Sequence, residues 1–154
     1  MLKLSKKADY ALIAVKHLAR QQAQRACSAH EIAQEYSISA TLMAKVLQTL
    51  ARHGLVTATH GAAGGYQLAK DPGELSVLEV ITAIEGPVQI TSCVSSHGPC
   101  DVMDNCSVRE PLRRVNAGIL HLLTALKISQ LHEDAPEPVL VELRSADAAV
   151  VGKG

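Results

Sequence analysis

The stretch "SAHEIAQEYSISATLMAKVLQTLARHGLVTATHGAAGGYQLAK", residues 28–70, decides the fold. Ser28 and Glu31 match the S-x-x-E capping box, a pattern that starts a helix. The letters "SIS" then interrupt the helical pattern, and Ser39 is placed to cap a second helix, "ATLMAKVLQTLARHG". Gly54 is well placed as the carboxyl-terminal stop of that helix. Two short helices joined by a tight turn predict a helix-turn-helix.

A glycine-rich segment follows the second helix directly. Residues 55–59 and 66–69 are expected to form two short strands, and three glycines free the turn region: Gly61, Gly64 and Gly65. A hairpin placed after a helix-turn-helix is a wing. The alternative, a glycine-rich loop that cradles phosphate, is rejected because no Lys-Ser/Thr pair follows the glycines.

Helical patterns flank this motif on both sides. One covers residues 6–21, and another starts at a second capping box, Ser76 to Glu79, and ends at Gly86. The longest pattern runs from about residue 107 to residue 131. A helix of that length on a small domain usually buries its apolar stripe against another chain, so we predict dimerisation through it. Packing within its own chain is the alternative.

The predicted fold class is mainly α: a winged helix-turn-helix with a long C-terminal dimerisation helix. Four segments follow from the patterns: a winged helix-turn-helix domain at 1–86, a cysteine-rich loop at 87–107, the dimerisation helix at 108–131 and a flexible tail at 132–154. The tail is acidic and contains prolines before it ends in small residues, which is typical of a mobile terminus.

The composition and the charge distribution limit the function. Aromatic residues make up only 2% of the chain, so we do not expect a stacking site for single-stranded nucleic acid. The net charge is zero, but residues 1–70 hold nine Lys/Arg against three Asp/Glu, and residues 71–154 hold six against twelve. The basic amino half therefore suits an anionic partner.

The amino terminus predicts the cellular compartment. Its apolar residues are interrupted by charges, unlike those of a signal peptide, and no apolar run approaches the ~20 residues that span a membrane. We therefore expect a cytoplasmic protein without a membrane partner. Disulfides are uncommon in the cytosol, where clustered cysteines more often hold metal or carry out redox chemistry.

The second helix of a helix-turn-helix enters the major groove with its amino-terminal side chains at the base edges. Here those residues are Ser39, Thr41, Ala44, Lys45 and Gln48. Phosphate contacts are expected from Lys3, Lys6 and Lys7, and His60 at the wing tip is expected to enter a minor groove. The alternative is that these residues are solvated faces of a protein-binding winged helix. The basic amino half favours double-stranded DNA.

Three of the four cysteines, Cys93, Cys100 and Cys106, share one loop with the spacing C-x6-C-x5-C. This spacing lacks the C-x2-C pair of zinc ribbons and fingers. Soft thiolates still suit an iron–sulfur cluster or zinc, and a fourth ligand must then come from outside the loop. Inert or redox-active thiols are the alternative. No nucleophile–base constellation indicates an enzyme, and Cys27 is expected simply to be packed.

The chain resembles the family of iron–sulfur winged-helix transcription regulators that includes IscR, the nitric-oxide sensor NsrR and the SUF-system assembly regulator. The resemblance covers residues 1 to about 131. It rests on "LSKKADYAL", on "ISATLMAKVLQTLARHGLV", on "GAAGGYQLAKDPGELSVLEVITAIEG" and on the three-cysteine loop. The segments "IEGPVQITSC" and "GPCDVMDNC" look closest to the SUF-assembly branch.

The resemblance implies a homodimer that binds a palindromic promoter site and carries an iron–sulfur cluster, [2Fe–2S] in preference to [4Fe–4S]. Cys93, Cys100 and Cys106 occupy the three thiolate positions of the family. IscR-like members have a histidine three residues after the last cysteine, whereas this chain has Arg109, which cannot ligate. Asp9 matches the amino-terminal acidic residue that NsrR-like members can use from the partner subunit, and an ordinary acid at a helix start is the alternative.

The function implied by the resemblance is cluster-controlled regulation of SUF-type cluster-assembly genes. A nitric-oxide or redox-sensing repressor and a cluster-free cysteine redox switch are the alternatives. His97 and His30 are weaker candidates for the fourth ligand. Ala44 stands where IscR has an acidic base-discriminating residue, and His60 replaces an arginine of the wing tip, so the operator is expected to differ from that of IscR.

Overall fold

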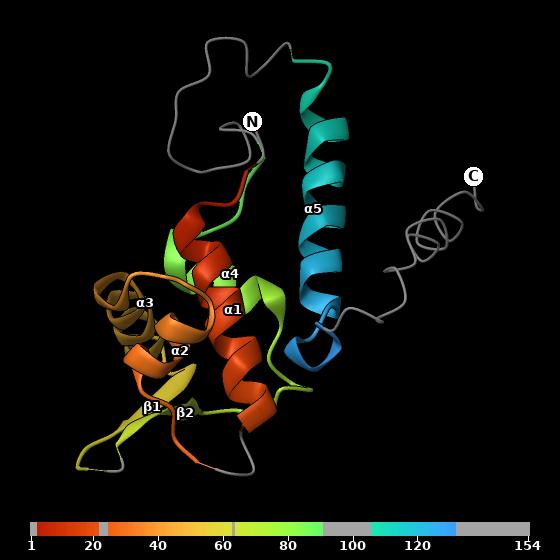
Figure 1. The fold of residues 1–154 in the computed structure, drawn as a ribbon. Helices are drawn as coiled ribbons and strands as arrows, with labels where there is room; N and C mark the ends of the chain where they lie inside the picture. The colour runs from red at the N-terminus through yellow and green to blue at the C-terminus, as the bar shows by residue number, and fades with distance from the viewer. Residues whose placement is uncertain (1–2, 22–24, 63, 91–105, 132–154) are drawn as a thin grey trace.

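The computed structural model describes residues 3–21, 25–62, 64–90 and 106–131 (Figure 1). The elements in chain order are α1 (Lys6–Gln21), α2 (Ala29–Glu35), α3 (Ala40–Arg52), β1 (Val56–Thr59), β2 (Gly65–Leu68), α4 (Val77–Glu85), α5 (Arg109–Ala125) and the 3₁₀ helix η3 (Ile128–Gln130). This is the mainly helical, winged-helix architecture that the sequence predicted. The predictions for Cys93, Cys100, His97 and the tail at 132–154 lie outside the described residues.

The helix-turn-helix forms where the local signals placed it. Both halves of the capping box are present: the Ser28 hydroxyl accepts from the Glu31 N–H at 3.1 Å, and the Ser28 N–H donates to Glu31 Oε2 at 2.7 Å. Ser39 occupies the N-cap position of α3, but its side chain makes no capping hydrogen bond. Gly54 follows α3 with φ of +70°, a left-handed conformation that favours glycine and ends the helix.

The core lies where α1 packs against α3 and α4. Three alanines of α1, Ala8, Ala11 and Ala14, are fully buried, whereas Tyr10 and Leu12 on the apolar pattern are only half-buried. The remaining core is aliphatic, with Leu18, Leu47, Leu50, Leu75 and Ile81 among its fully buried side chains. Small residues on α1 therefore let its neighbours approach closely, a feature that the spacing of large apolar residues did not reveal.

The wing is a two-stranded antiparallel hairpin in which Val56 pairs with Leu68 and Thr59 with Gly65. Its second strand is tied to the segment before α2, because Cys27 and Tyr66 exchange two backbone hydrogen bonds of 3.0 and 2.7 Å. A Cβ at Gly65 would lie 2.6 Å from the backbone carbonyl of Cys27, so this contact requires glycine. The sequence marked the glycine as a turn residue and did not predict this bridge.

The second capping box also forms, at the start of α4. The Ser76 N–H donates to Glu79 Oε2 at 2.9 Å, and the Glu79 N–H donates to the Ser76 hydroxyl at 3.2 Å. Lys70 Nζ adds an ion pair to Glu79 Oε1 at 2.8 Å. Gly86 ends the helix with φ of +81°, as predicted.

Glu79→Gln is expected to lower the free energy of unfolding at neutral pH by about 1 kcal/mol, because glutamine keeps an acceptor for Ser76 but loses the negative charge at the start of α4 and the ion pair with Lys70. Burial opposes ionisation of Glu79, but hydrogen bonds from Lys70 and Ser76 outweigh it and lower the pKa to about 2. Because the pKa of Glu79 is lower in the folded state, ionised Glu79 contributes its full stabilisation above the ordinary pKa of 4.5. This stabilisation is lost as the pH falls through about 2. Urea unfolding from neutral to acidic pH should show the difference shrinking in that window, and Glu74→Gln, an exposed carboxylate, should change little. A difference independent of pH would contradict this assignment.

The carboxyl-terminal helical pattern is divided in the structure, which corrects the expectation of one continuous helix to residue 131. α5 ends at Ala125, and Leu126 and Lys127 are extended. The chain then runs beside the start of α4: the Val77 N–H donates to the Leu126 carbonyl, and the Ile128 N–H donates to the Leu75 carbonyl, both at 2.9 Å. These backbone pairs end the helix at Ala125 and anchor η3 to the start of α4.

No helix in the described ranges is long and apolar enough to cross a membrane.

Candidate nucleic-acid interface and metal-ligand residues

The structure places the five predicted DNA-facing residues at the amino-terminal part of α3: Ser39, Thr41, Ala44, Lys45 and Gln48. All are exposed except Ala44, which is half-buried. The opposite side of α3 is anchored in the core by Met43, Val46, Leu47 and Leu50. Lys45 makes no ion pair with any other described residue, so its ammonium group faces solvent in the isolated chain.

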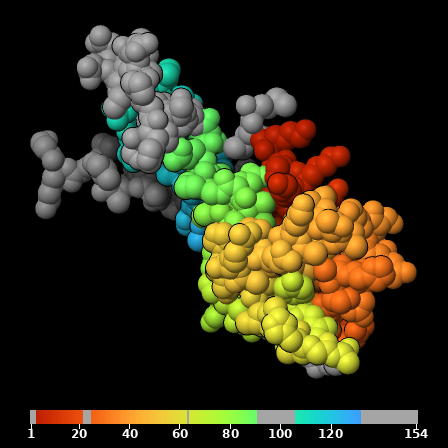
Figure 2. Space-filling view, turned by 90° about the vertical axis from the view of Figure 1, so that its left-hand side faces the viewer, coloured from red at the N-terminus to blue at the C-terminus, as the bar shows by residue number. Residues whose placement is uncertain are grey.

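The wing lies next to α3, and His60 is exposed directly after β1. In Figure 2, one face of the molecule presents the orange surface of α2 and α3, with the yellow hairpin below and the red start of α1 above. The wing and the start of α1 lie toward opposite ends of this domain (Figure 1). Lys6 is exposed at the first residue of α1, and Lys3 borders a cavity of about 230 Å³ together with Glu85. The structure therefore groups His60 with α3 and sets Lys3 and Lys6 apart from them.

Two of the four predicted metal ligands are described. Cys106 is half-buried three residues before α5, and Asp9 is exposed in the first turn of α1. Arg109, which stands at the histidine position of IscR-like members, is the exposed first residue of α5. Among residues 3–21, 25–62, 64–90 and 106–131, no group of three or more His, Cys, Asp or Glu side chains could hold a metal ion. Within one chain, the described residues do not assemble the site.

Ile90 and Cys106 are the described residues on either side of residues 91–105, and both lie next to α5. The Ile90 N–H donates to Asn116 Oδ1 at 3.1 Å, and Asn116 is 5% exposed, the only buried residue of α5. Cys106 leads directly into the same helix. Sequence reasoning missed Asn116, although it lies one turn from Leu112 and Ile119 on the apolar stripe, where a polar residue signals a buried hydrogen bond.

The first turns of α5 carry an excess of positive charge. A hydrogen bond from Arg113 lowers the pKa of Glu110 to about 2, so this carboxylate is ionised, with Arg113 Nη2 at 2.7 Å and Arg114 Nε at 3.5 Å. Together with Arg109, three arginines stand against one glutamate here.

Comparison with known proteins gives the class of the molecule. Residues 4–134 match Rrf2, a family described as iron-dependent transcriptional regulators. The chain belongs to the Rrf2 family. Its members are DNA-binding transcriptional regulators rather than enzymes, in agreement with the expectation from the sequence.

Relatives of this Rrf2 protein include the HTH-type transcriptional regulator IscR of Serratia proteamaculans, which is 26% identical over 99% of this chain and 93% of the relative. The solved structure of CymR, the global cysteine regulator of B. subtilis, is 27% identical with a TM-score of 0.72, covering 85% of this chain and 96% of that one. IscR of T. potens, 23% identical over 99% and 94% of the two chains, shares the fold with a TM-score of 0.66.

Proposed function

We propose that this Rrf2 protein is a homodimeric regulator whose binding to a palindromic promoter site is controlled by an iron–sulfur cluster, and that it regulates SUF-type cluster-assembly genes. The observation that carries the proposal is the exposed polar face of α3, beside a wing, in a chain whose cysteine loop begins and ends at α5. The similarity to relatives named IscR supports the cluster, and the SUF-type targets rest on the resemblance of the loop segments.

In the DNA complex, α3 enters the major groove and the wing contacts the neighbouring groove. Thr41 and Gln48 donate or accept hydrogen bonds at base edges or phosphates, and Lys45 binds a phosphate or a guanine edge. Ser39 adds a hydroxyl that its own helix does not use as a cap. Ala44 contributes shape rather than charge at the position that is acidic in IscR. His60 reaches the minor groove from the wing tip, while Lys3 and Lys6 supply more distant phosphate contacts.

Dimerisation through α5 accounts for a helix that its own chain leaves largely uncovered. Val108 and Val115 are 55% and 52% exposed, and further apolar side chains of α5 are only half-buried, among them Leu112, Ile119, Leu122 and Leu123. A second copy of α5 would bury this stripe in an isologous contact. Because η3 clamps the end of α5 to the domain through the backbone of Leu75 and Val77, the dimer would hold two α3 helices at a fixed separation.

The residues that would hold the cluster are Cys93, Cys100 and Cys106, with Asp9 of the partner as the fourth ligand. Three thiolates and a carboxylate form a donor set that fits iron–sulfur chemistry. When bound, the cluster supplies a core that oxidants and nitric oxide can damage. The Asp9 carboxylate makes no ion pair with a described residue, so no such pair would have to break before it binds the cluster.

Control of DNA binding then requires only a modest coupling free energy. Ligation would tie the loop at α5 to α1 of the partner through Asp9, and so restrain the spacing of the two α3 helices. A coupling of about 1–3 kcal/mol changes affinity about 5–150-fold, which is enough to switch a promoter.

Anaerobic purification followed by visible absorption and by iron and sulfide analysis tests the cluster. We expect the wild-type protein to be coloured and to contain both elements, and Cys106→Ala to lose them because one thiolate is missing. Cys27→Ala is the matched control, since Cys27 is a buried core thiol outside the loop. Asp9→Ala is expected to retain the thiolates but to shift the spectrum. An iron-free wild-type protein after reconstitution would overturn the cluster, and an unchanged Asp9→Ala spectrum would remove Asp9 as a ligand.

A cluster-free cysteine switch is the second candidate, favoured by the similarity to CymR structures. One of these is CymR of Staphylococcus aureus in an oxidized form, 24% identical with a TM-score of 0.68 over 88% of this chain and 99% of that one. An iron-free protein whose DNA affinity falls on oxidation and recovers with a reducing agent would support this candidate. A cluster that nitric oxide destroys, with Asp9 as its ligand, would instead indicate the nitric-oxide sensor.

A further inference from the structure

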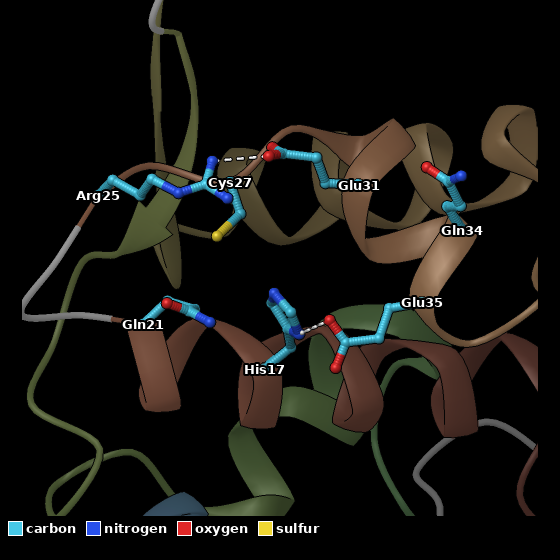
Figure 3. A pocket seen from close by; sticks show the side chains of 7 residues that line it. All are labelled: His17, Gln21, Arg25, Cys27, Glu31, Gln34 and Glu35. Atoms are coloured by element: carbon cyan, nitrogen blue, oxygen red, sulfur yellow. Dashed lines mark hydrogen bonds and ion pairs between the residues drawn. The ribbon is translucent and has the colours of Figure 1, made fainter.

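A groove that α3 does not line lies between α1 and α2 (Figure 3). Its volume is about 310 Å³, at the lower end of the range for small-molecule sites. His17 and Gln21 line it from α1, and Glu31, Gln34 and Glu35 line it from α2. Six of the seven lining residues have charged, amide or imidazole side chains, a set that suits a small, polar molecule.

The charges in this groove are unequal. Arg25 Nη1 pairs with Glu31 Oε1 at 2.6 Å, which neutralises one of the two carboxylates. Glu35 has no lysine or arginine partner among the described residues, and its Oε2 lies 3.4 Å from Nδ1 of His17. Within the lining of the groove, Glu35 is therefore the carboxylate without a lysine or arginine partner, and its side chain is 51% exposed. This arrangement favours a cationic ligand over an anion.

His17 holds the wall of the groove in place. Its side chain is 7% exposed, and Nδ1 also lies 3.3 Å from the Tyr36 hydroxyl, while the two rings meet edge-on with centroids 5.7 Å apart. Figure 3 shows the other ring nitrogen directed across the groove toward α2. The imidazole thus offers a fixed polar atom to an occupant and fixes the position of Glu35 beside it.

Cys27 closes one side of the groove, but thiol chemistry does not explain the site. The residue is 1% exposed, and burial raises the pKa of its thiol, so little thiolate is available for reaction. Its backbone also holds the wing through Tyr66. Cys27 is therefore a wall of the groove, and recognition falls to the charged and amide side chains.

We propose that the groove binds a small molecule that carries an ammonium group and has the size of a free amino acid. The ammonium group donates to the Glu35 carboxylate and to the amide oxygens of Gln21 or Gln34. A ligand that also carries a carboxylate would direct it to the guanidinium of Arg25. The site is independent of the cluster and adds a metabolite input to the proposed regulator.

Occupancy of the groove has a direct route to the DNA-reading helix. Glu35 ends α2, Tyr36 caps it, and Ser37 follows with φ of +54°, a strained turn that leads into α3. A ligand that bridges α1 and α2 would restrain this turn. The input would therefore act on the position of α3 without any change at the cysteine loop.

The test is a titration of the isotope-labelled full-length protein, without DNA, followed by amide NMR shifts. The probes are the common L-amino acids, the amines ethanolamine and putrescine, and glycerate, which matches serine but lacks the amine. At least one amine-bearing probe is expected to bind with saturable shifts in α1 and α2, and glycerate is not. Ethanolamine binding as tightly as serine would assign recognition to the amine alone, and tighter serine binding would add the carboxylate.

Glu35→Gln removes the negative charge of this side chain with almost no change of shape. It is expected to weaken binding about 10- to 100-fold, the effect of losing a hydrogen bond to a charged group. Glu74→Gln, an exposed carboxylate before α4, is the matched control and should bind normally. Absence of binding by every amine at millimolar concentration, or equal binding by Glu35→Gln, would overturn the proposal. Neither result depends on iron or DNA, so failure here leaves the proposed function intact.

Discussion

The double variant Thr41→Ala, Lys45→Ala is expected to bind promoter DNA about 100-fold more weakly than the wild-type protein. Both side chains are exposed on the first turns of α3 while the other side of that helix is buried, so they are available to DNA and contribute little to packing. A good base contact contributes about 1–3 kcal/mol, and a lost phosphate contact weakens binding to every sequence. Alanine is the best helix former, so α3 should remain folded.

Fluorescence anisotropy with an operator selected from a random-sequence library measures this effect, at several salt concentrations. The slope of log affinity against log salt should fall by about one, because Lys45 no longer displaces a counterion. Arg114→Ala removes the same charge from α5, where the side chain is 69% exposed, and should change affinity only slightly. A double variant that binds as tightly as the control would show that α3 does not read the DNA.

The helix-turn-helix and the wing were predictable because their signals are local. The two capping boxes each span four residues, and Gly54 and Gly86 end their helices in left-handed conformations that favour glycine. Each signal acts within a turn or two of chain, so it can be found in sequence without knowing the tertiary structure. The placement of Thr41 and Lys45 on the outer face of α3 followed from the helical spacing of the apolar residues on its inner face.

The contacts that were not predicted join segments far apart in the chain. Cys27 meets Tyr66, Ile90 meets Asn116, and Leu75 meets Ile128 through single hydrogen bonds or short bridges. The two backbone pairs have no sequence pattern of their own, because such pairing depends on where the tertiary fold brings two extended segments. Asn116 does carry a signal, a polar residue on an apolar stripe, but its partner Ile90 could not be found from the sequence. The fourth cluster ligand is a question of the same kind, since Asp9 would have to come from another chain.

Ile128 illustrates this limit, because the helical pattern assigned it to the exposed stripe of a dimerisation helix, whereas the structure buries it in the core. Ile128 is 2% exposed and packs with the cluster that includes Leu75 and Ile81. Ile128→Ala is therefore expected to lower the free energy of unfolding by about 3 kcal/mol, the sum of lost burial and an unfilled cavity. Ser129→Ala, an exposed neighbour in η3, should cost less than about 0.5 kcal/mol.

Urea unfolding of both variants at one protein concentration measures the difference, since the proposed dimerisation would make stability depend on concentration. Hydrogen exchange then locates it: the amides of Val77 and Ile128, which donate to Leu126 and Leu75, should lose protection before those in α1. Because η3 is the clamp between α5 and the DNA-binding domain, the same variant should also weaken DNA binding more than its loss of folded protein explains. Equal stability of Ile128→Ala and Ser129→Ala would mean that η3 does not anchor α5, and the fixed spacing of the two α3 helices would then need another cause.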